Sequence, residues 1–201
     1  QLRRMRIPAE VHLYPDKPHG AFGLERGVEF MRQMGFIGKL APEENIDERF
    51  PSDSDRAEYI REDIWPEGKT PCFQDHMNTP YIEWHFPKVK KTDAIQIIYS
   101  GGSYEGNGPE SFEVTPARRY LNSLGMTVVT MKYRSPRPKG LAKHTCAWQD
   151  LQRAIRLVRS QAEAYGLDPE KIGIMGSSAG GHLTLMGVTS SRHNSYKPID
   201  K

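Results

Sequence analysis

Residues 176–180, Gly-Ser-Ser-Ala-Gly, have the types and spacing of a nucleophilic serine site. A serine in the pattern Gly-x-Ser-x-Gly can attack a carbonyl carbon once a base removes its proton. The apolar run 172–175 before the motif predicts a buried strand, and the small and apolar residues after it predict a packed helix. The bend between them requires glycine, because the backbone there is strained and the helix must lie close to the sheet. We therefore expect Ser178 to be a nucleophile at the carboxyl end of a sheet, with the Ala179 amide facing the developing oxyanion. The alternative is a tight turn whose serine only caps the helix.

The segment from Gly176 to His182, with the turn 166–173 before it, resembles the nucleophile elbow of α/β-hydrolases. More narrowly, it resembles the esterase and lipase branch related to feruloyl and acetyl-xylan esterases. Four upstream segments share the resemblance: Trp65–Lys69, Ser100–Tyr104, Lys132–Arg134 and Trp148–Asp150. The resemblance implies an α/β fold with a mainly parallel sheet and helices on both faces, incomplete in this chain. It also implies hydrolysis of carbohydrate-linked esters, such as acetyl or feruloyl groups on plant polysaccharide, without a metal or an organic cofactor.

The glycine-rich segment 100–106 follows a second apolar run, residues 94–99, which predicts another strand. Its spacing does not fit the Gly-x-Gly-x-x-Gly of dinucleotide-binding loops. In the esterase branch, a His-Gly-Gly-Gly loop at this place supplies oxyanion donors, and here serines replace the histidine and the third glycine. The resemblance thus assigns the amides of Gly102 and Ser103 to the oxyanion hole together with that of Ala179. The Ser103 side chain narrows the approach to the acyl group. A plain turn is the alternative.

His19 is the candidate catalytic base. It lies in a loop between a predicted strand, residues 7–15, and a predicted helix, residues 24–34, as in the last part of an α/β-hydrolase domain. In that fold the histidine follows the nucleophile, whereas His19 precedes Ser178. Three arrangements remain open. The chain spans the end of one hydrolase domain and the start of a second, which we favour; it is a circular permutant; or His19 is incidental and the partner lies beyond residue 201.

The composition of residues 41–61 favours the first arrangement, because acidic residues and prolines there make a poor core and a good linker. We predict a carboxyl-terminal strand, histidine loop and helix in residues 1–40, an acidic linker in 41–61, and the first part of a second hydrolase domain in 62–201. No triad acid can be named in this chain. The 201 residues alone are accordingly expected to be inactive or poorly folded.

Other polar residues have structural interpretations. His182 cannot easily turn back to Ser178 along the same helix, so a packing and hydrogen-bonding role is predicted. Asp150 precedes the serine and stands near Arg153 and Arg156, which indicates a structural ion pair and not the triad acid. His85 alternates with buried residues and is predicted to be exposed. The two cysteines, Cys72 and Cys146, lack metal spacing; we expect both to be buried and assign neither a disulfide nor a metal.

Bulk composition excludes little. A net charge of +3 gives no strong attraction to nucleic acid or to an anionic membrane, and no apolar run reaches membrane-spanning length. The expected partner is a small-molecule or polysaccharide ester. Secretion or a periplasmic location would suit such a substrate, and the sequence leaves location and oligomeric state open.

The function predicted from the sequence is ester hydrolysis through an acyl-enzyme on Ser178. Two alternatives stay open. A serine peptidase of the prolyl-oligopeptidase type shares the same motif. A non-catalytic, hydrolase-like binding domain would accommodate the altered glycine loop.

Overall fold

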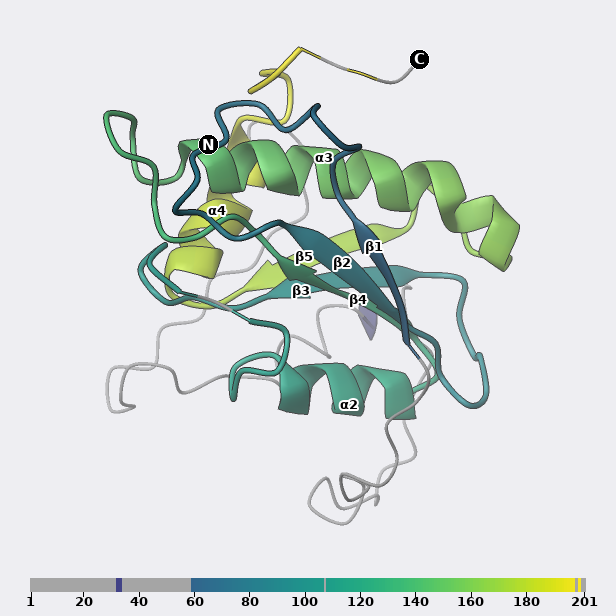
Figure 1. Ribbon diagram of the computed structural model, residues 1–201. Helices are drawn as coiled ribbons and strands as arrows, with labels where there is room; N and C mark the ends of the chain where they lie inside the picture. The colour runs from purple at the N-terminus through teal and green to yellow at the C-terminus, as the bar shows by residue number, and fades with distance from the viewer. Residues whose placement is uncertain (1–31, 34–58, 107, 198, 200–201) are drawn as a thin grey trace.

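The computed structural model describes residues 32–33, 59–106, 108–197 and 199 (Figure 1). The strands are β1 (Tyr59–Asp63), β2 (Tyr81–His85), β3 (Ile95–Tyr99), β4 (Thr127–Lys132) and β5 (Ile172–Gly176). The helices are α2 (Thr115–Ser123), α3 (Thr145–Gln161), the 3₁₀ turn η4 (Ala162–Tyr165) and α4 (Ala179–Thr189).

The five strands form one mixed sheet in the order β1-β2-β4-β3-β5. Strands β1 and β2 pair antiparallel, as do β2 and β4, whereas β3 pairs parallel with both β4 and β5. The carboxyl ends of β3, β4 and β5 therefore meet at the same edge of the sheet. This is the edge at which α/β proteins place their ligand sites.

Helices cover both faces of the sheet: α3 and α4 lie on one face and α2 on the other (Figure 1). The alternation along β3 explains this arrangement, because successive side chains of a strand point to opposite faces. Ile95, Ile97 and Tyr99 belong to the core beneath α3 and α4. Ile98 belongs to the second core, against α2. Strand β4 likewise contributes Val129 and Met131 to the first core and Val128 to the second, as expected for strands that are covered on both faces.

The strands and helices predicted from residue 80 onward are all present, with boundaries shifted by a few residues. The linker prediction was wrong at its end, because residues 59–61 begin β1 and do not belong to an irregular connection. Strand β1 is an edge strand with mostly exposed side chains, and its pairing with β2 holds it in place. Its sequence, Tyr-Ile-Arg-Glu-Asp, carries no burial pattern from which a strand could be read.

Two predictions of exposure were wrong. His85 is only 2% exposed. Its neighbour Trp84 belongs to the core beneath α3 and α4, so the His85 side chain points to the opposite face of the sheet, which α2 covers (Figure 1). Cys72 is exposed, whereas Cys146 is buried as predicted, and both are free thiols.

The predicted strand 7–15 and the histidine loop lie outside the described residues. Of the predicted helix 24–34 only Arg32 and Gln33 are described, and both are helical. No helix in the described part of the chain has the length and apolar character needed to cross a membrane.

Candidate active site

Ser178 occupies a sharp bend between β5, which ends at Gly176, and α4, which begins at Ala179. Its backbone angles are φ 49° and ψ −117°, a region that residues with a side chain rarely adopt. Such strain persists only where the surrounding structure enforces it, and it is concentrated at functional sites. Ser178 is an exposed residue, so the bend places it at the surface of the described sheet edge.

The two glycines of the motif allow the strand, the helix and the neighbouring strand to meet. A Cβ atom on Gly176 would lie 2.6 Å from the backbone of Gly180, and one on Gly180 would lie 2.7 Å from the carbonyl oxygen of Ser100. Real Cβ atoms do not approach backbone this closely, so any side chain would push α4 away from the sheet. Glycine at both positions is therefore required for close packing.

The glycine-rich loop lies directly against this elbow. Strands β3 and β5 are in register with Tyr99 opposite Gly176, so the residues that follow each strand emerge side by side. An ideal Cβ on Gly101 would lie 2.7 Å from the Ser178 Cβ and 2.8 Å from the Ser177 carbonyl oxygen. The segment that carries Gly102 and Ser103 thus begins in contact with the candidate nucleophile.

Side chains from outside the loop hold its first peptide groups. The Tyr133 hydroxyl, just beyond β4, donates toward the carbonyl oxygens of Gly101 at 2.6 Å and Ser100 at 3.1 Å. The Gly101 amide donates to Glu113 Oε2 at 2.6 Å. Burial raises the pKa of Tyr133, with Tyr104 and Glu113 adding to the rise, so its hydroxyl stays protonated as a donor. Both polar groups of Gly101 are therefore fixed by side chains that face it from different elements.

His182 has the hydrogen-bonding role that its sequence position predicted. Its Nδ1 atom lies 2.8 Å from the Tyr104 hydroxyl, and its backbone N–H donates to the Ser178 carbonyl oxygen. The His144 ring packs against it at 5.5 Å between centroids. Burial, followed by His182 and Lys143, lowers the pKa of His144.

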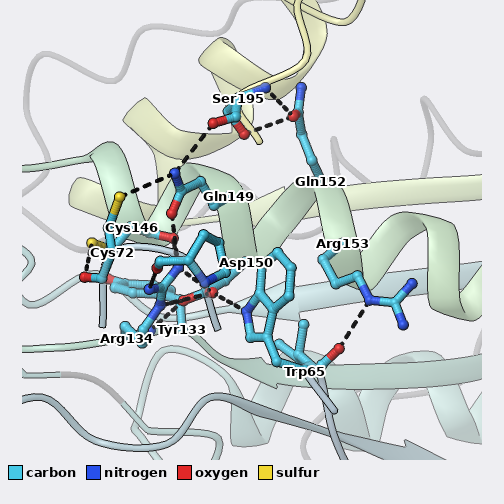
Figure 2. A network of polar contacts seen from close by, with 12 residues as sticks. Trp65, Cys72, Tyr133, Arg134, Cys146, Gln149, Asp150, Gln152, Arg153 and Ser195 are labelled. Carbon is cyan, nitrogen blue, oxygen red and sulfur yellow. Dashed lines mark hydrogen bonds and ion pairs between the residues drawn. The ribbon is translucent and has the colours of Figure 1, made fainter. Parts of the chain in front are cut away.

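A buried network of polar contacts, shown in Figure 2, holds the segment that carries Tyr133. Asp150, on α3, accepts hydrogen bonds from the backbone N–H and the guanidinium of Arg134 and from the Trp65 indole. Arg134 also donates to backbone carbonyls of Pro71 and Cys146. Because Arg134 follows Tyr133 directly, this network ties the end of β4 to α3.

The ion-pair partners predicted for Asp150 were wrong, although its structural role holds. Arg134 Nη2 lies 2.9 Å from Asp150 Oδ1, with both side chains fully buried. Arg153 instead donates to the Ile64 carbonyl and Arg156 to Asn194. Burial raises the pKa of the Asp150 carboxyl, and the charge and hydrogen bonds of Arg134 act against that rise.

The predicted site residues divide into two groups. Ser178, Ala179, Gly102 and Ser103 belong to the elbow and the loop that meet at one edge of the sheet. His19 lies outside the described residues, and its pairing with Ser178 stays a prediction.

The sequence alone predicted no role for Tyr133 or Glu113. Tyr133 lies in Lys132–Arg134, a segment that shares the family resemblance and follows a predicted strand, so the sequence contained a signal for it. The residues around Glu113 contain no comparable signal. Among the described residues, no cluster of three His, Cys, Asp or Glu side chains could hold a metal.

Comparisons with known proteins find relatives among esterases. The family model described as BD-FAE matches residues 83–200, more than half of the chain. The acetylxylan esterase of Xylanibacter ruminicola is 33% identical over 93 residues, which cover 45% of this chain and 18% of that protein. Esterase LipQ of Mycobacterium tuberculosis is 33% identical over 111 residues, covering 52% of this chain and 24% of that protein.

Solved structures give the same fold. The acetyl ester-xyloside bifunctional hydrolase from Caldicellulosiruptor lactoaceticus matches with a TM-score of 0.53 and 29% identity, over 62% of this chain and 44% of that one. Esterase Est2 of Thermogutta terrifontis matches with a TM-score of 0.51 at 24% identity. The predicted α/β-hydrolase fold class is thereby confirmed. The described sheet is mixed and not mainly parallel as predicted, because β2 pairs antiparallel with both β1 and β4. The chain spans 18% and 24% of the length of the two curated relatives above.

Proposed function

Because the chain belongs to the BD-FAE family, we propose that it is part of a serine ester hydrolase acting on acetyl esters of carbohydrate. The observation that carries this proposal is the strained, exposed Ser178 at the elbow, in contact with the glycine loop through Gly101. A hydroxyl presented in this way, next to backbone amides at a helix start, is suited to attack on a carbonyl.

In the proposed reaction, Ser178 Oγ attacks the acyl carbon while a histidine accepts its proton. The amides of Gly102, Ser103 and Ala179 stabilise the tetrahedral oxyanion, and the alcohol leaves with the proton. Water, activated by the same histidine, then releases the acid from Ser178. His19 is the candidate for that histidine, either in this site or in a preceding domain.

Two considerations favour a small acyl group on a carbohydrate. Ser103 has a side chain where the resembling loops have glycine, and this side chain narrows the acyl side of the site. Two of the relatives bear names that specify acetylxylan and acetyl ester-xyloside hydrolysis. Acetylated xylan is therefore the substrate we expect to be preferred over feruloylated xylan.

The test uses the full-length protein and its Ser178→Ala variant. Release of acetate from acetylated xylan and of p-nitrophenol from p-nitrophenyl acetate should fall by at least about 1,000-fold in the variant, because the nucleophile is lost. Equal turnover by both proteins would refute the assignment of Ser178. Absence of turnover in both would support a binding-only domain.

A further inference from the structure

The glycine loop has three consecutive residues in the left-handed region of backbone space. Their φ angles are 87° at Gly102, 55° at Ser103 and 64° at Tyr104. Glycine adopts this conformation readily, but serine and tyrosine rarely do. Such a run persists only when contacts outside it enforce it. Gly102 and Ser103 are exposed, whereas Tyr104 is only 1% exposed, so Tyr104 is where the loop is anchored.

The anchor consists of packing and one hydrogen bond. The Tyr104 ring lies 5.8 Å from the Tyr133 ring and meets the His182 ring edge to face at 6.1 Å. Its hydroxyl lies 2.8 Å from His182 Nδ1. Burial raises the pKa of Tyr104 to about 12, so the hydroxyl keeps its proton and can donate it to the imidazole.

The other end of this hydrogen bond belongs to the nucleophile's own helix. His182 is one turn along α4, and its backbone N–H donates to the Ser178 carbonyl at 3.0 Å. The ring of His144, the residue before α3, also packs against His182, with 5.5 Å between the ring centroids. The Tyr104–His182 bond therefore joins the oxyanion loop to the first turn of the elbow helix.

We propose that Tyr104 and His182 are positioning residues that hold the Ser103 amide in register with Ser178. The proposed oxyanion hole takes its donors from the loop and from the start of α4. The distance between the loop amides and the Ala179 amide therefore depends on the contacts that join the loop to α4. The backbone contacts of Gly101 and Gly180 join the start of the loop to the elbow. Farther along the loop, at Tyr104, the connection is the side-chain hydrogen bond to His182, one helical turn from the nucleophile. The inference about loop order stands on the structure alone, and only its kinetic consequence rests on the proposed function.

The first test measures loop order without relying on activity. Backbone ¹⁵N order parameters of Gly102 and Ser103 should be about 0.85 in the wild type and fall below about 0.6 in Tyr104→Phe and His182→Ala. His182→Asn should keep the wild-type values, because an asparagine amide can place an acceptor where Nδ1 stands. Tyr165→Phe, which removes a hydroxyl from the aromatic cluster with Trp84 and Phe86, is the matched control. Unchanged order in Tyr104→Phe, or equal loss in both His182 variants, would overturn the proposal.

The second test measures p-nitrophenyl acetate turnover by the full-length protein. Tyr104→Phe and His182→Ala should each lower kcat about tenfold or more with KM within about twofold, since misplaced donors weaken mainly transition-state binding. The double variant should be no slower than either single variant, because both remove the same bond. If the losses in kcat of the two single variants multiply in the double variant, the proposal is contradicted. If the wild type shows no Ser178-dependent turnover, the proposed function fails, and the order parameters still decide whether this bond positions the loop.

Discussion

The Ser103 side chain stands at a position where glycine would be conformationally easier, since φ is 55° there. We expect Ser103→Gly to widen the acyl side of the site while relieving backbone strain. The ratio of kcat/KM for p-nitrophenyl butyrate to that for p-nitrophenyl acetate should rise about tenfold, the effect typical of added space for methylene groups. The melting temperature should not decrease. A ratio that stays constant would mean that Ser103 does not limit acyl size.

His85 provides a test of stability against pH. Burial, together with the Arg118 charge, lowers the pKa of His85 from 6.5 to about 3. The folded protein therefore keeps His85 neutral, and its contribution to stability is complete above pH 6.5 and is lost as the pH falls from 6.5 toward 3. Glu83, whose pKa burial raises, lies 3.8 Å away and opposes this trend.

The comparison of wild type with His85→Gln isolates the histidine, because Glu83 is present in both proteins. Between pH 6 and pH 4, the free energy of unfolding of the wild type should fall by about 1.4 kcal/mol per pH unit more than that of the variant. Urea unfolding at several pH values measures this difference. Parallel pH profiles would show that His85 titrates normally in the folded protein.

Individual polar residues were the hardest to predict from sequence. His85 alternates with apolar residues along its strand, and this pattern predicted an exposed side chain. Asp150 is followed by Arg153 and Arg156, and this spacing predicted the wrong ion-pair partners. Their partners, Thr130 and Arg134, come from another strand and from the loop after it. The environment of such a residue depends on contacts with residues distant in sequence, and local sequence patterns do not reveal these contacts. Glu113 was missed for the same reason.

The elbow and the glycine loop act as one unit because their backbones touch. We predict that Gly180→Ala lowers the free energy of unfolding by about 1–3 kcal/mol, since its new Cβ would overlap the Ser100 carbonyl. Activity should fall as well, because the loop is displaced from Ser178. Gly106→Ala is the control, as a Cβ there meets no atom within 4 Å. Equal stability of the two variants in urea unfolding would mean that the loop and α4 do not pack as described.

Secondary-structure elements with apolar runs were predictable, and the exposed edge strand was not. Strands β3, β4 and β5 each follow a turn and are rich in apolar and β-branched residues, so their length and composition predicted them. Strand β1 carries charged residues on an exposed edge, and only its pairing with β2 defines it. Edge strands commonly carry charge, which removes the pattern that identifies a strand.

At the scale of the whole molecule, one side of the described sheet ends at β5. The side chains of β5 are half-buried, whereas those of β3 are fully buried. The chain also matches only 44% of the Caldicellulosiruptor lactoaceticus hydrolase. We expect residues 1–201 alone to turn over p-nitrophenyl acetate at least about 1,000-fold more slowly than the full-length protein. The sequence predicts that the triad acid lies outside these residues, and a nucleophile without its complete triad is only weakly active. Rapid turnover by the 201 residues would show that this chain already holds a complete site.

The assignment of Ser178 as the nucleophile is tested most directly by locating a covalent adduct. The full-length protein would be treated with a p-nitrophenyl phosphonate, digested, and analysed by mass spectrometry. We predict one adduct, on Ser178, with loss of esterase activity in proportion to labelling and no adduct in Ser178→Ala. A labelled serine elsewhere, with Ser178→Ala still active, would contradict the account.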